Sequence, residues 1–560
     1  MYSISAAQDG MWYYDARLKQ TKNGTFPVPV DDKNQLYKDL NYRVSMMNDQ
    51  TYRLRINPIK SESLDEDDEL EVEAGPSQSR WEIPDSLLGR TQDDYGMRHA
   101  WNRFSISNDT VCMELSNIND AGDRYISTKD RSLIFTEYYL EMGFLLESQK
   151  IFGFGERVRE FELAPGNYTS WSNGRDNNYD KGELGHHSYG DHPFVLVKLK
   201  NSFAGIFFKN SNAKSLEYAR YGDSQSVLTF RAAGGVLDFF FLFGETAESV
   251  VKAYHGVIGV PYFPPFWALG FQQSSWQYDN TGKVKDVMSK YDDAGMPLEA
   301  MWLDIEYMNK YRNFEVDTAR FSNIPALAQD LHQKKQKLVT IVDAGFAADT
   351  DYSYYKQASE QNLFIKSANS TDFNGNLIGK VWPGKAAFID FTCPGSTEFW
   401  INGLTGLWTA TTTDGIWIDM NEATTFCDGE CPKDVNGTAQ GKTYPFDPTG
   451  AGYSMQTMSL SLDGQHCYTN DTEKDLNTEF NMHSLYGTLQ AKATFDFWIK
   501  GTKLQGRRPF VLSRSTFAGA GKYTSHWLGD NFSKWEYMRY SVSGIMNFQM
   551  FGIPLVGADV

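Results

Sequence analysis

IPALAQDLHQKKQKLVTIVDAGF, residues 324–346, sets an amphipathic helix directly before a buried strand, and this order decides the fold. In residues 324–337 the apolar side chains recur three and four positions apart, which is the spacing of one helix face. Residues 338–346 are then mostly apolar, as in a strand that is covered on both of its faces. A helix that leads straight into such a strand is typical of α/β folds with parallel strands.

The same alternation runs through residues 261–560. It predicts strands at 266–271, 298–304, 338–346, 415–419, 508–514, 525–530 and 553–559, with helical stretches such as 284–295, 480–500 and 533–552 between them. Seven strands fit a (β/α)8 barrel of the TIM type that lacks its last strand. Residues 347–400 and 426–478 interrupt the alternation. We expect these two insertions to form the rim of an active site, because loops after barrel strands usually do so.

Residues 1–260 follow a different pattern. Short β-prone segments, among them 52–56, 194–200, 205–210 and 226–233, are separated by Gly, Asn and Asp. Regular short strands with polar turns predict an N-terminal β-sandwich. The predicted fold class is therefore multidomain, a β domain followed by an α/β domain, with the division near residue 260. A chain of 560 residues is also longer than one core usually supports.

Composition narrows the choice of partners. The formal net charge is −18, from 53 Lys and Arg against 71 Asp and Glu, which argues against nucleic acid and anionic membranes. No apolar run approaches the roughly 18 residues of a transmembrane segment. The first ten residues, MYSISAAQDG, lack the basic and apolar segments of a signal peptide. Aromatic residues make up 15% of the chain and fit either a large core or a sugar-binding site.

The chain has five cysteines: Cys112, Cys393, Cys427, Cys431 and Cys467. An odd number in so long a chain does not indicate a disulfide framework. The last three lie in one polar region, and we expect one disulfide there if the compartment is oxidising. A zinc site is the alternative, but the C-x3-C spacing and a single nearby histidine disfavour it.

Charged residues gather at the predicted strand ends. They are Asp304, Asp343, Asp419, Arg514, Asp530 and Asp559. Side chains at these ends of a barrel converge on one mouth. Asp419 in GIWIDMNE and Asp530 in HWLGDN each follow an apolar run with tryptophan close by, and a pair of carboxylic acids is what cleavage of a glycosidic bond requires. Asp343 and Asp559 fit equally well as helix caps. Arg514 could hold a nucleophile ionised, form a salt bridge within the barrel, or do both.

Several motifs resemble glycoside hydrolase family 31. They are WIDMNEATTF (417–426), RPFVLSRSTFAGAGKYTSHWLGDN (508–531), FGIPLVGADV (551–560), WLDIEYM (302–308) and KVWPGKAAFIDFTCP (380–394). The likeness is greatest to the lysosomal and intestinal maltase branch of α-glucosidases, and it covers most of residues 165–560. Family members hydrolyse α-linked glucose from non-reducing ends with retention, so the resemblance implies this activity and requires neither cofactor nor metal.

The resemblance also implies roles for single residues. Asp419 resembles the nucleophile and Asp530 the acid/base. Residues that resemble the substrate-binding set are Asp176, Trp276, Asp304, Trp382, Met420, Phe426, Arg514 and Trp527. Two alternatives stay open: a truncated relative that binds a glycan or a partner without turnover, and an α-transglucosidase or α-xylosidase that uses the same two acids.

The resemblance bears on completeness and location as well. The family's barrel continues past the seventh strand, whereas this sequence ends at Val560. We therefore expect either a fragment or a second polypeptide that completes the barrel, and poor behaviour of the chain alone because open strand edges are exposed. The family branch implies an extracytosolic, secreted or lysosome-like location, although no signal peptide is visible.

Overall fold

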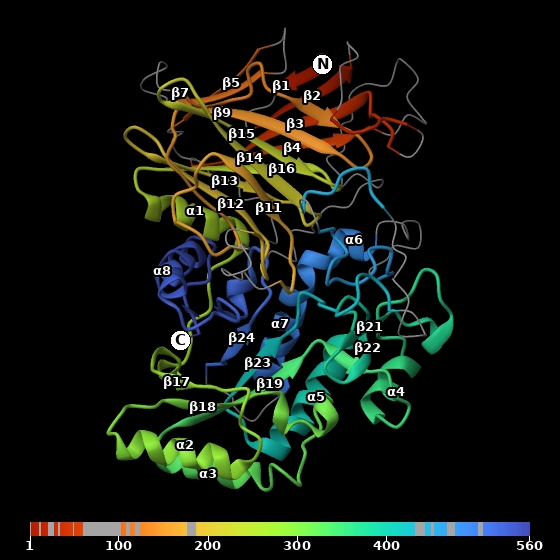
Figure 1. Cartoon of the computed structure of the whole chain (residues 1–560). Helices are drawn as coiled ribbons and strands as arrows, with labels where there is room; N and C mark the ends of the chain where they lie inside the picture. Colours follow the sequence, from red (N-terminus) through yellow and green to blue (C-terminus); the bar gives the residue numbers. More distant parts are fainter. Residues whose placement is uncertain are drawn as a thin grey trace.

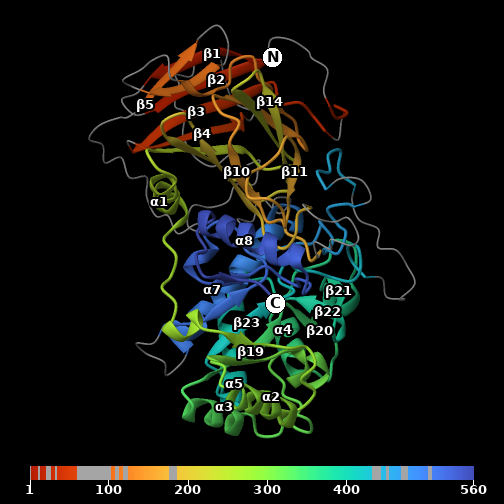
Figure 2. The ribbon, with the colours of Figure 1, turned by 60° about the vertical axis from the view of Figure 1, so that its left-hand side comes forward.

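The computed structural model consists of a β-rich half stacked on an α/β half (Figure 1). Figure 2 shows the same two layers from another side, with the C-terminus beside the α/β half. The structure describes residues 2–9, 13–20, 27–31, 34–48, 50–59, 102–107, 112–117, 124–175, 186–431, 443–449, 453–467, 477–501 and 508–559.

The β-rich half contains two sheets of mostly antiparallel strands. The first runs in the order β1 (Tyr2–Asp9), β2 (Tyr13–Gln20), β3 (Asp39–Asn48), β4 (Thr51–Pro58), β16 (Leu237–Gly244), β13 (Phe203–Phe208), β12 (His192–Lys198) and β10 (Ile151–Gly155). The second runs β11 (Gly166–Ser170), β14 (Lys214–Tyr221), β15 (Gln225–Ala232), β9 (Leu140–Leu146), β7 (Arg124–Ser127), β6 (Cys112–Asn117) and β5 (Asn102–Ser107), with β8 (Leu133–Phe135) paired to β9.

One core lies between these two sheets. Along β15 the side chains alternate between buried and half-buried, as expected of a strand with one face on a core. Phe144 of the second sheet packs edge-to-face on Phe239 of the first, with ring centroids 5.0 Å apart. The predicted N-terminal β-sandwich is confirmed.

The α/β half is built on a sheet of seven parallel strands. Their order is β17 (Gln272–Gln273), β18 (Ala300–Leu303), β19 (Lys337–Asp343), β23 (Gly415–Asp419), β24 (Val511–Ser513), β25 (Ser525–Trp527) and β26 (Val556–Gly557). The helices of this half are α2 (Thr281–Asp293), α3 (Ile324–Gln333), α4 (Ser353–Glu360), α5 (Ser396–Thr411), α6 (Glu479–Met482), α7 (Tyr486–Asp496) and α8 (Trp535–Met550). Among the described residues β17 and β26 are the two edges, so the prediction of a TIM-type barrel one strand short is confirmed.

Two details of this half differ from the sequence prediction or add to it. The strand predicted at 266–271 is wrong: Phe266–Leu269 form a 3-10 helix, and β17 occupies only the next two polar residues. Pro264 and Pro265 precede this turn, and proline offers no N–H to a strand ladder. The insertion at 347–400 contributes to a small antiparallel sheet of β20 (Gly345–Ala347), β22 (Gly384–Phe388) and β21 (Ile378–Val381).

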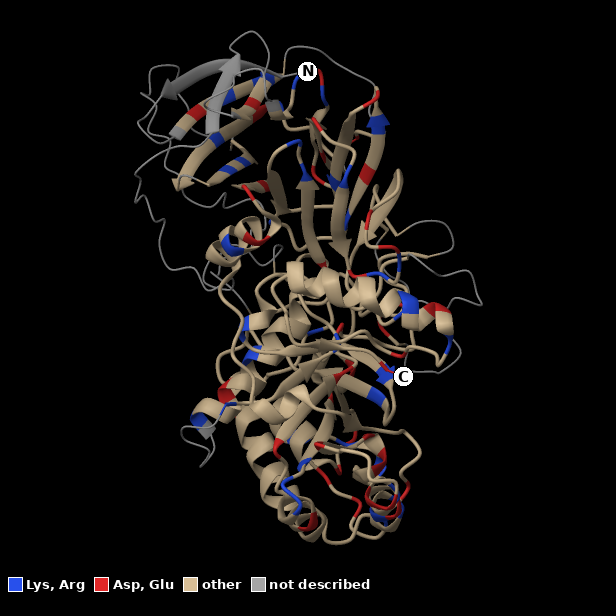
Figure 3. Cartoon of the chain, turned by 90° about the vertical axis from the view of Figure 1, so that its left-hand side faces the viewer, with Lys and Arg blue, Asp and Glu red and all other residues tan. Residues whose placement is uncertain are grey.

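The two halves meet along α1 (Ala247–Ile258) and α8, which Figure 1 shows between them. Phe194 of the sandwich stacks on Tyr254 of α1 at 4.2 Å, and His192 stacks on Phe551 after α8 at 4.8 Å. In Figure 3 acidic and basic positions are interspersed along both halves. No helix in the described part of the chain is both long and apolar enough to cross a bilayer.

Candidate active site

The parallel sheet brings the predicted strand-end residues to one edge. β19 and β23 pair in register, so that Asp343 lies directly beside Asp419. Asp304 follows β18, and its carboxylate accepts the backbone N–H of Ile305 at 2.7 Å. Arg514 follows β24, and Asp530 and Asp559 follow β25 and β26. Since the carboxyl ends of parallel strands open on one mouth, all six groups belong to the same end of the barrel.

Arg514 is the central cation of this mouth. Its Nε lies 3.1 Å from Oδ1 of Asp419. The same guanidinium donates two parallel hydrogen bonds to Glu422, Nε to Oε1 at 2.8 Å and Nη2 to Oε2 at 2.7 Å. Met420, with φ of 56°, turns the chain after β23, and its Sδ accepts from Nη2 at 3.2 Å. Arg514 therefore serves both as a salt bridge within the barrel and as the counter-ion of Asp419.

The acids at the mouth resist ionisation because they are withdrawn from water. Burial raises the pKa of Asp304 to about 7. Burial also raises the pKa of Asp419 to about 7, with the charges of Asp530 and Glu422 adding to the rise and Arg514 opposing it. Asp559 shifts in the same direction, to about 7. The negative charge of Asp530 contributes to all three shifts, so its carboxylate faces the same space.

Asp343 differs from its neighbour Asp419. Its side chain is buried, 1% exposed, and neither carboxylate oxygen has a hydrogen-bond partner in the structure. Burial and the charge of Asp419 raise the pKa of Asp343 well above its usual range. Asp343 therefore holds its proton more tightly than Asp419, whose charged form Arg514 favours. The cap alternative for Asp343 is wrong, because the carboxylate receives no N–H.

Aromatic side chains occupy two levels of the barrel. Trp417 packs against Trp302 and Trp527 with centroids 5.5 and 5.4 Å apart, and Trp527 is buried in this interior group. Trp276, Trp382 and Phe426 are exposed and lie together at the rim, with centroids 6.0 Å apart for the two tryptophans and 5.4 Å for Trp382 and Phe426. Faces of this kind can stack on sugar rings. Asp176 lies outside the described residues.

Residues 261–560 match the family described as glycosyl hydrolases family 31 TIM-barrel domain. The chain belongs to this family.

Curated relatives agree with this family assignment, and a solved structure shares the fold. Human intestinal sucrase-isomaltase is 33% identical over 500 residues, which is 87% of this chain and 26% of that protein. Rat lysosomal alpha-glucosidase is 34% identical over 446 residues, 78% of this chain and 44% of that protein. A crystal structure of the heterodimeric complex of ER glucosidase II superimposes with a TM-score of 0.81 at 20% identity, over 100% of this chain and 63% of that chain. The chain thus spans about a quarter to a half of these two curated relatives.

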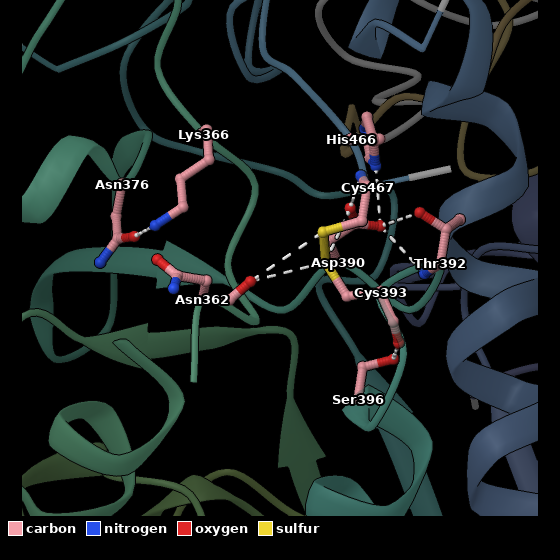
Figure 4. Close-up of a disulfide and its surroundings, with 9 residues drawn as sticks. All are labelled: Asn362, Lys366, Asn376, Asp390, Thr392, Cys393, Ser396, His466 and Cys467. Atoms are coloured by element: carbon pink, nitrogen blue, oxygen red, sulfur yellow. Dashed lines mark hydrogen bonds and ion pairs between the residues drawn. A yellow bond between two sulfur atoms is a disulfide. The ribbon is translucent and has the colours of Figure 1, made fainter. Parts of the chain in front are cut away.

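A second buried charge cluster of this family 31 chain lies in its insertions, beside a disulfide (Figure 4). Both ring nitrogens of His466 face carboxylates: Nδ1 lies 3.0 Å from Asp390 and Nε2 lies 2.8 Å from Glu479. Glu479 also bonds Nδ1 of His483 at 2.7 Å, and the other ring nitrogen of His483 donates to the carbonyl of Ser172 in the β-rich half at 2.8 Å. The chain of bonds thus ties both insertions to the sandwich.

The charges of this second cluster stabilise one another. Burial opposes the charge of His466, but Asp390 and Glu479 outweigh it and raise the pKa of His466 to about 10. Burial likewise opposes ionisation of Glu479, but the bonds from His466 and His483 lower its pKa to about 2. The pKa of Asp390 is also lowered, against its own burial, chiefly by His466. The cluster is therefore a fully paired ionic network.

The cysteines near this network form disulfides. Cys427 pairs with Cys431, which confirms the one disulfide expected in that region. Cys467 pairs with Cys393, which the sequence prediction missed. Among the described residues, one group has the spacing of metal ligands: Asp390, Cys393 and Cys467. Its two sulfur atoms are bonded to each other. Because the three cysteines of the zinc alternative, Cys427, Cys431 and Cys467, all lie in disulfides, none is a thiolate and that alternative is wrong.

Sequence reasoning missed Glu422 as the bidentate partner of Arg514. Its signal was present, because the quoted motif GIWIDMNE ends on it. Tyr189, whose ring lies 4.8 Å from the Arg514 guanidinium, was also missed. It belongs to the other half of the molecule and carries no local motif, so only the structure reveals it.

Proposed function

We propose that this family 31 chain is a retaining exo-α-glucosidase, acting mainly on α-1,4-linked glucose of maltose-type oligosaccharides. The observation that carries the proposal is the contrast between two acids at one mouth. Asp419 lies against Arg514 and is mostly enclosed, with 16% of its side chain exposed. Asp530 is open to solvent and close enough to raise the pKa of Asp419. A nucleophile whose charged form is favoured by a cation and an acid that exchanges protons with water need these two environments.

The proposed reaction has two displacements. Asp530 donates its proton to the glycosidic oxygen while a carboxylate oxygen of Asp419 attacks the anomeric carbon, so that the bond to the leaving sugar breaks as the glucosyl-enzyme forms. Asp530 then takes a proton from water as that water displaces Asp419 and releases glucose. We expect the two carboxyl groups to act across roughly 5–5.5 Å, the separation of retaining enzymes.

The remaining mouth residues would bind the sugar. Asp304 can exchange hydrogen bonds with hydroxyl groups, and the rim aromatics Trp276, Trp382 and Phe426 offer faces for the rings of the substrate. Asp176, Met420 and Trp527 complete the proposed set through the family resemblance. The names of the relatives support an α-glucosidic substrate, since sucrase-isomaltase and lysosomal alpha-glucosidase are both among them.

The decisive experiment compares Asp419→Asn with Asp530→Ala on maltose and on an aryl α-glucoside. We expect Asp419→Asn to lower kcat at least about 10⁴-fold on both substrates, the scale on which loss of a covalent nucleophile is felt. We expect Asp530→Ala to lose maltose hydrolysis but to be rescued by azide with the aryl glucoside, because azide attacks the glucosyl-enzyme without needing a base. The product of that rescue is the α-glucosyl azide.

Asp286→Asn on helix α2 is the matched control, since this aspartate is exposed and lies on a helix before β18 rather than at a strand end. Proton NMR of the first glucose released distinguishes retention, which gives the α-anomer, from inversion. Full activity of Asp419→Asn would contradict the assignment. Transfer of glucose to sugar in place of water, or release of xylose, would instead favour the transglucosidase or α-xylosidase alternative. An intact wild-type chain that binds maltose without turnover would favour the non-catalytic one.

We also propose that further polypeptide, either more of a longer chain or a second chain, completes the barrel. The helix α8 beside the edge strand β26 exposes an apolar stripe at three- and four-residue spacing: Trp535, Met538, Val542 and Met546. The segment before β17, the other edge, exposes Phe263, Phe266 and Leu269. The chain expressed alone should associate or aggregate through these surfaces. A monodisperse monomer in light scattering would contradict the proposal.

An extracytosolic, lysosome-like or secreted location is part of the same proposal. The two disulfides support it, because disulfides persist in oxidising compartments. A relative named lysosomal supports it as well. Fractionation of the source cells with an antibody to this chain tests it, and a purely cytosolic signal would overturn it.

A further inference from the structure

One side chain of the β-sandwich reaches into the mouth of the barrel. Tyr189 lies in the segment that leads into β12 and is 2% exposed. Its ring lies against the guanidinium of Arg514, with 4.8 Å between Cζ of the arginine and the ring centroid. This guanidinium is the group that contacts Asp419 and is held by Glu422. Tyr189 therefore covers the open face of the cation beside the proposed nucleophile.

The same tyrosine also touches the chain at the proposed acid/base. Its hydroxyl oxygen accepts the backbone N–H of Asp530 in a long hydrogen bond of 3.4 Å. Gly529 has φ of 77°, and a Cβ atom there would lie 2.0 Å from Cε2 of Tyr189. The phenol ring thus lies directly on the peptide that carries Asp530, at a position where only glycine fits.

The backbone around Tyr189 is fixed to the barrel at several points. The Tyr189 carbonyl accepts the hydroxyl of Ser515 at 2.9 Å, and the N–H of Asp191 donates to the carbonyl of Thr516 at 2.9 Å. Both partners follow Arg514 directly in the chain. Between these points, Gly190 N–H donates to Oε2 of Glu156 at 2.9 Å. The main chain therefore fixes the position of Tyr189, so its side chain can restrain Arg514 and the Asp530 peptide.

We infer that Tyr189 is a positioning residue that fixes Asp530 relative to the Asp419–Arg514 pair. This inference rests on the proposed function of the two acids. The ring restrains the arginine on one side, and the hydroxyl restrains the Asp530 peptide on the other, so a single rigid group sets the geometry between both carboxylates. Loose hydrogen bonds of this kind tighten when substrate binds, and small displacements of an acid lower its rate of proton transfer.

The test is Tyr189→Phe, which keeps the ring over Arg514 and removes only the hydroxyl. We expect kcat/KM to fall about tenfold on maltose, whose leaving sugar needs the proton of Asp530. We expect a fall of less than about threefold on 2,4-dinitrophenyl α-glucoside, whose leaving group needs none. Tyr218→Phe is the matched control: Tyr218 is equally buried in the sandwich, and its hydroxyl donates to the carbonyl of Gln149 at 2.9 Å.

A purely structural role would lower kcat/KM equally on both substrates, and that result would overturn the inference. Unchanged kcat/KM on maltose would overturn it as well. A second measurement does not depend on turnover. Hydrogen exchange of the Asp530 amide, read by mass spectrometry on peptides that span 529–531, should quicken in Tyr189→Phe and stay unchanged in Tyr218→Phe. Unaltered exchange in Tyr189→Phe overturns the positioning role. If exchange quickens in Tyr189→Phe but the wild-type chain hydrolyses neither substrate, the proposed function is contradicted and the positioning role is not.

Discussion

The barrel mouth and the network beside the Cys393–Cys467 disulfide both bury acidic side chains, but they satisfy them differently. In the network, Asp390 and Glu479 share the imidazole of His466, and their pKa values are lowered. At the mouth, Asp343 has no hydrogen-bond partner in the structure, and the pKa values of Asp343 and Asp419 are raised. The acids of the two regions are alike in residue type and in burial, but the hydrogen-bond donors that face their carboxylates differ.

Under the proposed function, this difference separates a structural group of acids from a reactive one. A carboxylate that receives several donors is stable in its charged form and is inert over the neutral range. Carboxylates that are crowded by others and short of donors keep their protons to higher pH, as Asp343 and Asp419 do. Strongly shifted pKa values of this kind are typical of functional sites. The insertions thus pair each of their buried acids with a histidine, whereas at the mouth Arg514 pairs with Glu422 and Asp419 and leaves Asp343 without a donor.

Glu479→Gln should produce the largest loss of stability. The substitution leaves the buried imidazolium of His466 with one carboxylate in place of two and weakens the link through His483 to the sandwich. Removing one partner from a buried ion pair typically costs about 3–5 kcal/mol of unfolding free energy. Urea denaturation at neutral pH measures it. A loss below about 1 kcal/mol would mean that the network is not the tie proposed here.

The two disulfides should differ in their effect on stability. Cys393–Cys467 closes a loop with a sequence separation of 74 residues, and Cys427–Cys431 closes one with a separation of 4. Loop-closure entropy predicts losses of about 4 and about 2 kcal/mol when each pair is replaced by serine. Denaturation of the two double variants tests the ratio. Equal losses would indicate that the long-range disulfide adds little to what the neighbouring ionic network already holds.

Part of this comparison could be read from the sequence. Asp304, Asp419 and Asp530 were placed at one mouth, because each follows an apolar strand and parallel strands share an edge. The strand at 266–271 was wrong because the apolar run FWALGF outweighed the two prolines before it. The sequence pattern predicts contacts reliably where the residues lie at equivalent positions of successive β/α units.

The rest depends on contacts between distant parts of the chain. The pairing of Arg514 with Glu422 needs the left-handed turn at Met420, which no propensity predicts. His466 meets Asp390 across 76 residues, and in the sequence this histidine stands out only as part of a disfavoured zinc site. Such pairings are set by loops that pack on one another, and one sequence holds no signal for them.

The pH dependence of stability should separate the two regions. The pKa of Glu479 falls from about 4.3 in the unfolded chain to about 2, so its contribution is complete above about pH 4.5 and is lost as the pH falls toward 2. The pKa of Asp304 rises from about 3.9 to about 7, so its contribution is complete below about pH 4 and is lost as the pH rises through 7. Asp559 is more exposed than Asp304, so we expect it to contribute less to the pH dependence of stability.

Asp304→Asn tests the second window. As the pH rises from 4 to 7, the free energy of unfolding should fall by about 1–2 kcal/mol less in the variant than in the wild type, because the asparagine side chain has no charge to bury. Denaturation curves at half-unit pH intervals give the difference. The slopes of unfolding free energy against pH are compared, because a constant cost of losing the hydrogen bond from the Ile305 N–H to Asp304 does not change a slope. Parallel curves for the two proteins would show that the mouth acids ionise as freely as in water.

Asp343→Asn should change stability least, by less than about 1 kcal/mol, although Asp343 is as buried as Glu479. Its carboxyl group is already neutral near pH 7 and gives up no hydrogen bond, so an amide of the same shape replaces it at little cost. Glu479→Gln, the same exchange of carboxylate for amide, is its matched counterpart. If Asp343→Asn cost as much as Glu479→Gln, then Asp343 would be ionised and paired like the network acids, and the distinction between a reactive and a structural group of buried acids would fail.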